Sequence, residues 1–445
     1  MAQQPVVIVG GGWAGIAAAI ELTHHGVAVT LIDSGQRLGG RGRSVLLAGV
    51  EVDNGQHLLI GAYSETLRLM QRLGLKEHEL FFRQPTLLDS RGFKLPGFRL
   101  SLPMAPAPFH FVLGLLRAEG FSSKEKFAIL RFCARQKWRD FRLADDLPLG
   151  PWLTSQGQSD KVVQQLWKPL CLAILNTPIE IASTAIFLRV LRDSFTLKRG
   201  YSDFLVARHN LGKLLPEPAQ AYLHTRQSSV VLGERIKQLE FDGDDGVRLH
   251  AAANSYWGKD VILALAPDQC LQLTASIGAL TELNEKLSRF KPSPITTIYL
   301  QYPAHIGLRQ SLLGISGGLL EWLVDRAYCD QPGLIAGVIS GPGPHMLLSK
   351  EALIERALGE LRCLFPHWPA PLSGAVIREK RATYLCEAGI HRLRPGPATA
   401  LPRLWLAGDY TDTGYPATLE GAVRSGVACA QALMQHRSAN AASSE

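Results

Sequence analysis

The chain has 445 residues, of which 46% are hydrophobic and 19% charged, and its formal net charge is +8 at pH 7. This length gives room for two domains with substantial cores, and the composition excludes a largely disordered chain. The positive residues are scattered and form no arginine-rich or aromatic-interleaved motif, so we expect no nucleic-acid partner.

A glycine-rich turn lies between an apolar run, Val6–Val9, and a stretch of small residues, Ile16–Leu22. The first run predicts a buried parallel strand and the second a helix. Gly10, Gly12 and Gly15 have the spacing G-x-G-x-x-G that binds dinucleotides in this context. The first glycine permits the tight turn, the second lets the backbone approach a pyrophosphate, and the third lets helix and strand pack closely.

A second apolar strand is predicted at Val27–Ile32, and it ends in Asp33. This acid is placed to accept hydrogen bonds from a ribose diol. The helix N-terminus faces the phosphates with its unpaired N–H groups. We expect three neighbours to contact the nucleotide as well: Trp13, Ala14 and Ser34.

A second loop of glycines and arginines follows directly, with Arg37, Gly39, Gly40, Arg41 and Arg43. The glycines allow close approach and the arginines can pair with phosphate oxygens. Here the sequence resembles the FAD-dependent amine oxidase and phytoene desaturase superfamily, whose motif reads roughly LGGR at this point. The resemblance implies FAD rather than NAD as the cofactor.

The segment Asp53–Gly61 reads DNGQHLLIG and follows a predicted hairpin that turns at Ala48–Gly49. In the resembled superfamily this segment runs beside the flavin ring. The resemblance therefore implies that Gly55, Gln56 and His57 contact the cofactor, and that the last two are candidates to face the substrate. The alternative for His57 is a polar residue that caps or anchors the loop.

Residues 100–116 carry no charge and approach the length of a membrane span, but three prolines interrupt them. A transmembrane helix is therefore not expected. Two interpretations remain open: a buried wall of a substrate cavity, or an apolar lip that dips into a membrane surface. Seven basic residues lie at or beyond the end of the stretch: Arg117, Lys124, Lys126, Arg131, Arg135, Lys137 and Arg139.

From Pro151 to Phe195 the pattern is helical and apolar, which suits either a deep apolar chamber or plain domain core. The runs Leu166–Ser183 and Val190–Phe195 resemble the hydroxysqualene dehydroxylase branch, also described as squalene-associated FAD-dependent desaturases. That branch implies reductive removal of the hydroxyl of hydroxysqualene to give squalene, in hopanoid or sterol precursor synthesis, with hydride from reduced flavin N5. The implied substrate is an apolar C30 isoprenoid.

Because no second G-x-G-x-x-G unit exists for NADPH, we expect an external electron donor.

The chain then returns to the nucleotide domain. Residues 229–231 should add an edge strand where the superfamily packs a valine, here Val231, near the adenine. Asp260–Pro267 is another buried strand. A second excursion has predicted strands at Pro294–Pro303, Gly318–Tyr328 and Gly333–Ser340, followed by a helix at Lys350–Leu364.

In amine oxidases a lysine near the strand corresponding to Ile295–Leu300 helps hold a water by the flavin. This sequence has Ile295, Thr296 and Thr297 there, which weakens an amine-oxidase interpretation.

The C-terminal stretch Leu404–Leu433 has the same order of elements as the first motif. A predicted buried strand ends in Gly408–Asp409 and is followed by a helix of small residues. In the superfamily this aspartate binds the ribityl and pyrophosphate region, and the helix start lies against the flavin pyrimidine edge. The resemblance therefore implies cofactor contacts from Ala417, Thr418 and Leu419.

The expected fold is α/β, with a Rossmann-like FAD-binding domain and an interleaved α+β substrate domain of the amine oxidase and phytoene desaturase type. We expect the FAD-binding domain at 1–80, 205–270 and 395–435, the substrate domain at 81–204 and 271–394, and a flexible tail at 436–445.

The first apolar run is already the first strand, so no signal peptide is expected. Seven widely spaced cysteines with no C-x-x-C pair, and histidines with no H-E-x-x-H, predict reduced thiols in the cytoplasm and no metal site. Contact with the inner face of the cell membrane stays open.

Three alternatives to the dehydroxylase stay open. A carotenoid or terpenoid desaturase of the phytoene desaturase type would run hydride transfer in the oxidising direction on a similar polyene. The others are a flavin amine oxidase and a prenyl-binding escort without flavin.

No catalytic residue can be assigned from the sequence. Besides Gln56 and His57, four residues are candidates for a proton donor, and each also fits a structural role: Asp193, Asp203, Tyr384 and Tyr415.

Overall fold

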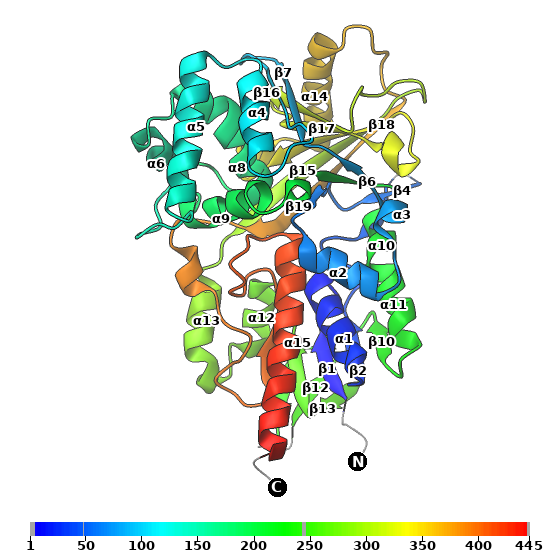
Figure 1. Cartoon of the computed structure of the whole chain (residues 1–445). Coiled ribbons are helices and arrows are strands. Elements are labelled where there is room, and N and C mark those ends of the chain that lie inside the picture. The colour runs from blue at the N-terminus through cyan, green and yellow to red at the C-terminus, as the bar shows by residue number, and fades with distance from the viewer. Residues whose placement is uncertain (1–4, 48, 243–245, 443–445) are drawn as a thin grey trace.

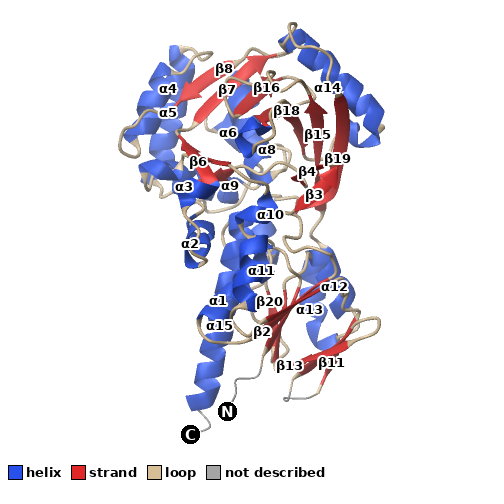
Figure 2. Ribbon diagram, turned by 90° about the vertical axis from the view of Figure 1, so that its right-hand side faces the viewer, coloured by secondary structure: helices blue, strands red, loops and turns tan. Residues whose placement is uncertain are grey.

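The computed structural model describes residues 5–47, 49–242 and 246–442. Two lobes follow one another along the long axis (Figure 2). The lower lobe contains a five-stranded parallel sheet, and the upper lobe contains a seven-stranded mixed sheet. This arrangement confirms the predicted α/β fold with a Rossmann-like sheet and a separate substrate-domain sheet.

The parallel sheet has the strand order β10-β2-β1-β14-β20, and every neighbouring pair is parallel. Its strands come from three distant stretches of chain: β1 (Val6–Val9) and β2 (Val29–Asp33), then β10 (Ser229–Leu232) and β14 (Asp260–Leu263), and finally β20 (Leu404–Leu406). The strands β1, β14 and β20 are buried throughout, which explains their continuous apolar sequences. A small antiparallel sheet joins β11 (Gln238–Phe241), β12 (Val247–His250) and β13 (Ser255–Gly258).

Two helices from opposite ends of the chain pack along each other beside this sheet: α1 (Trp13–His24) and α15 (Leu419–Ala442) (Figure 1). The contact is close because small residues face each other. A Cβ atom on Gly426 would lie 2.1 Å from the carbonyl oxygen of Ala14. The first motif and the C-terminal motif are therefore held together by direct helix packing.

The upper sheet has the order β19-β15-β18-β17-β16-β7-β8, and its β16–β7 pair is parallel while the others are antiparallel. Its strands are β7 (Leu87–Gly92), β8 (Phe98–Ser101), β15 (Pro292–Gln301), β16 (Leu312–Ser316), β17 (Trp322–Asp325), β18 (Leu334–Ser340) and β19 (Ser373–Tyr384). The predicted strands at 294–303 and 333–340 are confirmed. The one predicted at 318–328 is shorter, because a 3₁₀ turn, Arg326–Cys329, follows β17.

The helices of the upper lobe include the predicted one at 350–364, which is confirmed as α14 (Lys350–Leu364). The others are α4 (Phe109–Arg117), α5 (Ser123–Trp138), α6 (Leu149–Ser155), α7 (Asp160–Val162), α8 (Lys168–Leu175) and α9 (Thr184–Phe195). A capping box between Ser122 and Glu125 starts α5. At the end of α8, Asn176 is left-handed, and its side chain bonds the backbone of Pro294 and Gly341, which ties α8 to the sheet.

Shorter elements complete the chain. The predicted hairpin is confirmed as β3 (Ser44–Leu47) and β4 (Val50–Asp53), although Ala48 of its turn lies outside the described residues. A three-stranded sheet joins β5 (Leu59–Ile60), β9 (Phe204–Ala207) and β6 (Phe81–Gln84). The remaining helices are α2 (Ser64–Arg72), α3 (Glu77–Leu80), α10 (Leu211–Leu214), α11 (Pro216–His224), α12 (Pro267–Thr274) and α13 (Thr281–Ser288).

Two expectations about domain limits differ from the structure. Helices α12 and α13 lie beside the lower lobe in both views (Figures 1 and 2), so the chain returns to the upper lobe at β15 rather than at residue 271. Residues 436–442, which we expected in a flexible tail, continue α15. The reason is that His436 packs on Trp405 and Arg437 pairs with the buried Asp260 at 2.7 Å. The other predicted domain limits stay predictions.

The α1–α15 contact generates a stability prediction. We expect Gly426→Ala to lower the free energy of unfolding by about 1–3 kcal/mol, because the added methyl overlaps the backbone of α1. The control is Gly359→Ala on α14, where nothing lies within 4 Å, and which should stabilise by about 0.4–1 kcal/mol. Thermal unfolding midpoints compare the two, and equal midpoints would contradict this account of the packing.

Candidate functional site: a cavity shared by the two lobes

A cavity of about 1320 Å³ is lined by residues of both lobes. Single small-molecule sites usually measure about 300–1,000 Å³, so this cavity is larger than one such site usually is. Its lining falls into two parts. A polar part follows the ends of β1 and β2 and the start of α15, and an apolar part follows α8, α9 and the upper sheet.

The glycines of the first motif shape the polar part. A Cβ atom on Gly15 would lie 1.9 Å from the carbonyl oxygen of Gly10, and one on Gly10 would lie 2.3 Å from that of Ala264. Both residues therefore allow the turn and the helix to pack, and Gly15 does not line the cavity. Gly12 differs, since a Cβ there would meet nothing closer than Gly40 at 3.9 Å. It lies in the cavity lining together with Gly10, Trp13 and Ala14.

Asp33 lies at the end of β2, in the cavity lining beside Ser34. Its two carboxylate oxygens accept hydrogen bonds of 2.6 Å from the backbone N–H groups of Gly11 and Gly35. The acid is thereby fixed against the first glycine turn. The structure places Val231 next to Ile32 in the parallel sheet, outside the cavity lining. From this part of the chain, residues 234–237 line the cavity instead.

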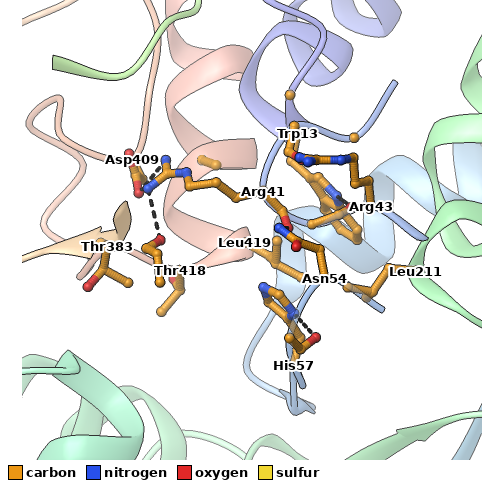
Figure 3. A pocket seen from close by; sticks show the side chains of 18 of the residues that line it. Trp13, Arg41, Arg43, Asn54, His57, Leu211, Thr383, Asp409, Thr418 and Leu419 are labelled. Carbon is orange, nitrogen blue, oxygen red and sulfur yellow. Dashed lines mark hydrogen bonds and ion pairs between the residues drawn. The ribbon is translucent and has the colours of Figure 1, made fainter. Parts of the chain in front are cut away.

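Arg41 joins the two ends of the chain across the cavity (Figure 3). Its guanidinium lies 2.8 Å from Oδ2 of Asp409 and donates to the carbonyl of Ala382 at 3.0 Å. Burial lowers the pKa of Arg41, but the Asp409 carboxylate outweighs it, and the net shift is upward. The other oxygen of Asp409, Oδ1, is buried and has no partner among the described residues.

The loop around Asp409 is held by a buried arginine that no sequence motif indicated. Arg394 is buried and donates to the carbonyl oxygens of Asp409, Thr411 and Tyr415 at 3.1, 2.9 and 2.6 Å. On the facing arginine loop, the indole of Trp13 donates to the carbonyl of Gly42 at 2.8 Å. Five further residues predicted to contact the cofactor line the cavity: Gly40, Gly408, Ala417, Thr418 and Leu419.

The segment after β4 carries a buried polar network. The carboxylate of Asp53 pairs with Arg326 at 2.9 Å, and both side chains are 4% exposed. Gln56 accepts from Arg326 at 3.1 Å and donates to the Tyr299 hydroxyl at 2.7 Å. That hydroxyl in turn donates to the Asp53 carbonyl at 2.8 Å. Gln56 lines the cavity, but its amide supports the loop and is not free.

His57 lies in the lining next to Gly55, whose φ of +100° favours glycine. The Nδ1 atom of His57 is 3.1 Å from the carbonyl oxygen of Gly55 (Figure 3). Since a carbonyl only accepts, Nδ1 must carry the hydrogen, and Nε2 keeps its lone pair. Burial lowers the pKa of His57, so the ring is neutral at pH 7.

Of the four candidate proton donors, the structure brings Asp193 and Tyr415 together in the lining. The Tyr415 hydroxyl donates to Asp193 at 2.7 Å, and the carboxylate also accepts from Arg189 and Arg192 at 3.1 Å each. Burial, and next the hydrogen bond to Asp193, raises the pKa of Tyr415. Asp193 is therefore held by three side chains, which fits the structural role that the sequence also allowed.

The other two candidates lie outside the lining. Asp203 forms ion pairs with Arg199 and Arg83. Tyr384 packs edge-on against Phe290 with ring centroids 5.1 Å apart.

The apolar part of the cavity is built from the stretch that carried the branch resemblance and from the upper sheet. Helices α8 and α9 form one side and strands β16, β17 and β18 another. The side chains that line it are Ile60, Leu88, Leu170, Ile174, Val190, Phe195, Phe204, Leu312, Trp322, Val324, Val338 and Ile377. The residues from 151 to 195 therefore supply both a chamber wall and domain core, since Trp167 and Phe187 are buried behind it.

The polar part fits FAD on observations of its own. The helix α1 starts at a glycine that leaves open space, an acid ends β2, and an unpartnered carboxylate oxygen of Asp409 needs a hydrogen-bond donor such as a ribityl hydroxyl. Arg41 brings a positive charge that suits a pyrophosphate. Among the described residues, no group of histidine, cysteine and acidic side chains is suited to hold a metal ion.

Fold and site together define a flavin-dependent oxidoreductase. The chain belongs to the flavin containing amine oxidoreductase family, whose model matches residues 13–434. FAD is accordingly its cofactor. Cyclohexylamine oxidase from Brevibacterium oxydans has the same fold, with a TM-score of 0.72, 16% identity, and coverage of 98% of this chain and 100% of the other.

Relatives at higher identity act in isoprenoid chemistry, as their names state. Hydroxysqualene dehydroxylase from Rhodopseudomonas palustris is 30% identical over 434 residues, which cover 95% of this chain and 96% of that one. The Zymomonas mobilis enzyme of the same name is 26% identical over 441 residues, 96% of this chain and 99% of that one. The 15-cis-phytoene desaturase of Solanum lycopersicum is 25% identical, with 97% of this chain and 77% of that one covered.

The unpartnered oxygen of Asp409 generates a binding prediction. We expect Asp409→Ala to weaken FAD binding about 10- to 100-fold, the range that follows from losing a charged hydrogen-bond acceptor in a buried site. Fluorescence titration of the apoprotein with FAD measures the effect. Glu282→Ala, on an exposed pair with Lys286, is the control and should bind FAD as the unchanged chain does. Equal affinities for the two variants would refute this role of Asp409.

Proposed function

We propose that this protein reductively removes the hydroxyl of hydroxysqualene to give squalene. The observation that carries the proposal is the apolar chamber, which is continuous with the FAD-binding part of one cavity. A C30 isoprenoid has no charge to pair and needs a long apolar enclosure. The names of two relatives at 26–30% identity support the same reaction.

The chain's own residues contribute enclosure and orientation. When bound, FAD supplies hydride transfer chemistry. The network of Asp53, Arg326 and Gln56 holds the segment that carries His57 at the cavity wall. Of the His57 ring atoms, Nε2 is the one free to accept a hydrogen bond from a substrate hydroxyl. Leu170 and Phe195 are among the side chains that keep water from the apolar part.

A carotenoid-type desaturase is the second candidate, because it needs the same apolar enclosure and the Solanum lycopersicum relative bears that name. An amine oxidase is less favoured. Thr297 on β15 is buried beside Gly55 at the strand where the superfamily's amine oxidases carry a lysine. A prenyl-binding escort without flavin is disfavoured by Asp33 and Asp409, which both lie in the cavity.

Electrons must reach the cofactor from an external donor, since the chain shows one dinucleotide-binding motif. We place the protein in the cytoplasm, in contact with the inner face of the cell membrane, where an apolar substrate would be found. No helix of the described residues is long and apolar enough to cross that membrane.

Single-turnover chemistry tests the reaction. We expect the FAD-loaded chain, reduced with dithionite under anaerobic conditions, to convert hydroxysqualene into squalene, detected by mass spectrometry. The apoprotein, from which FAD has been removed, is the negative control. If the flavin stays bound and reduced while no squalene forms, the dehydroxylase proposal is wrong. Desaturation of a C30 or C40 polyene by the oxidised protein would then favour the second candidate.

A further inference from the structure

Helix α4 has an apolar face that no part of the described chain covers. Phe109, Leu113 and Leu116 point outward at i, i+4 and i+7 spacing, and Phe109 and Leu116 are 64% and 54% exposed. Met104, in the loop before the helix, is 80% exposed. The two interpretations left open for residues 100–116 were a cavity wall and an apolar lip at a membrane. The helix in this stretch has one buried side and one exposed side, so each interpretation applies to one of its sides.

The buried side of α4 explains why the exposed side stays in place. Gly114 packs so tightly that a Cβ there would lie 2.8 Å from the carbonyl of Ser101 on β8. His110 is fully buried and lies 3.3 Å from the hydroxyl of Ser202. The Phe111 ring contacts that of Phe195 with centroids 5.5 Å apart. Because Ser202 and Phe195 line the cavity, α4 forms part of the wall between the cavity and solvent.

Basic side chains lie at both ends of the exposed face. Lys126 donates to the carbonyl of Leu116, and Arg117 ends the helix. At the other end, Lys198 is exposed next to Arg199, whose guanidinium lies 3.0 Å from the sulfur of Met104 and also pairs with Asp203. Residues 100–142 contain eight lysines and arginines against three acidic residues. We call the face formed by Met104, Phe109, Leu113 and Leu116, with its basic rim, the α4 surface.

We infer that the α4 surface docks on an anionic lipid bilayer. Apolar side chains at the centre and basic side chains at the rim match the acyl boundary and the negative headgroups of such a bilayer. A second copy of the chain fits poorly, because two copies meeting here would bring their basic rims together. Docking would place the cavity wall at α4 directly against the membrane, where an apolar substrate dissolves. The inference depends on the surface alone, so vesicle binding tests it independently of the proposed reaction.

Flotation of the FAD-loaded full chain with vesicles tests the inference. We expect binding to equimolar phosphatidylcholine and phosphatidylglycerol vesicles, and roughly tenfold less binding to phosphatidylcholine alone. The double variants Phe109→Ser/Leu116→Ser and Arg117→Gln/Lys198→Gln should each lose roughly tenfold in binding to the anionic vesicles. The matched control is Leu347→Ser/Leu372→Ser, which removes two leucines that are 91% and 71% exposed elsewhere and should bind normally.

Retained flavin absorbance and an unchanged thermal midpoint show that each variant is folded. Binding of the Phe109→Ser/Leu116→Ser variant at the level of the unchanged chain would overturn the inference. So would failure of the unchanged chain to bind anionic vesicles. A dimer in analytical ultracentrifugation that this variant abolishes would also overturn it, by assigning the α4 surface to a second copy.

Discussion

The ion pair between Arg41 and Asp409 is the contact on which the cofactor site depends. Its partners are 368 residues apart in the sequence, and they meet at 2.8 Å across the cavity. The pair neutralises a buried carboxylate on one oxygen and leaves the other for a ligand. Helices α1 and α15 bring the same two ends of the chain together elsewhere, since Gly426 lets their backbones approach closely. This one pair therefore connects the two ends of the chain and leaves a carboxylate oxygen available to the cofactor.

The cofactor half of the site could be predicted from the sequence because its signals are local. The spacing of Gly10, Gly12 and Gly15 between a strand and a helix determines a turn whose geometry few other sequences allow. Asp33 follows its strand directly, and Asp409 follows another, so both acids must lie at the same edge of a parallel sheet. These inferences require no knowledge of how distant segments pack.

The substrate half could not be predicted in the same way, because it arises from tertiary contacts. Nothing in the sequence around Arg326 indicates that it pairs with Asp53 or supports Gln56. The apolar run from 151 to 195 suited core and chamber equally, and the structure uses it for both. Val231 illustrates the same limit, since its strand was predicted while its side chain lies outside the cavity lining.

We propose that one cavity holds FAD and a C30 isoprenoid against each other. Titration of the FAD-loaded chain with squalene, followed by the visible absorbance of the bound flavin, tests this most directly. A ligand in the apolar chamber would exclude water from the flavin and change its surroundings. We expect a saturable spectral change with one squalene bound per chain. Saturable squalene binding that leaves the flavin spectrum unchanged would contradict it.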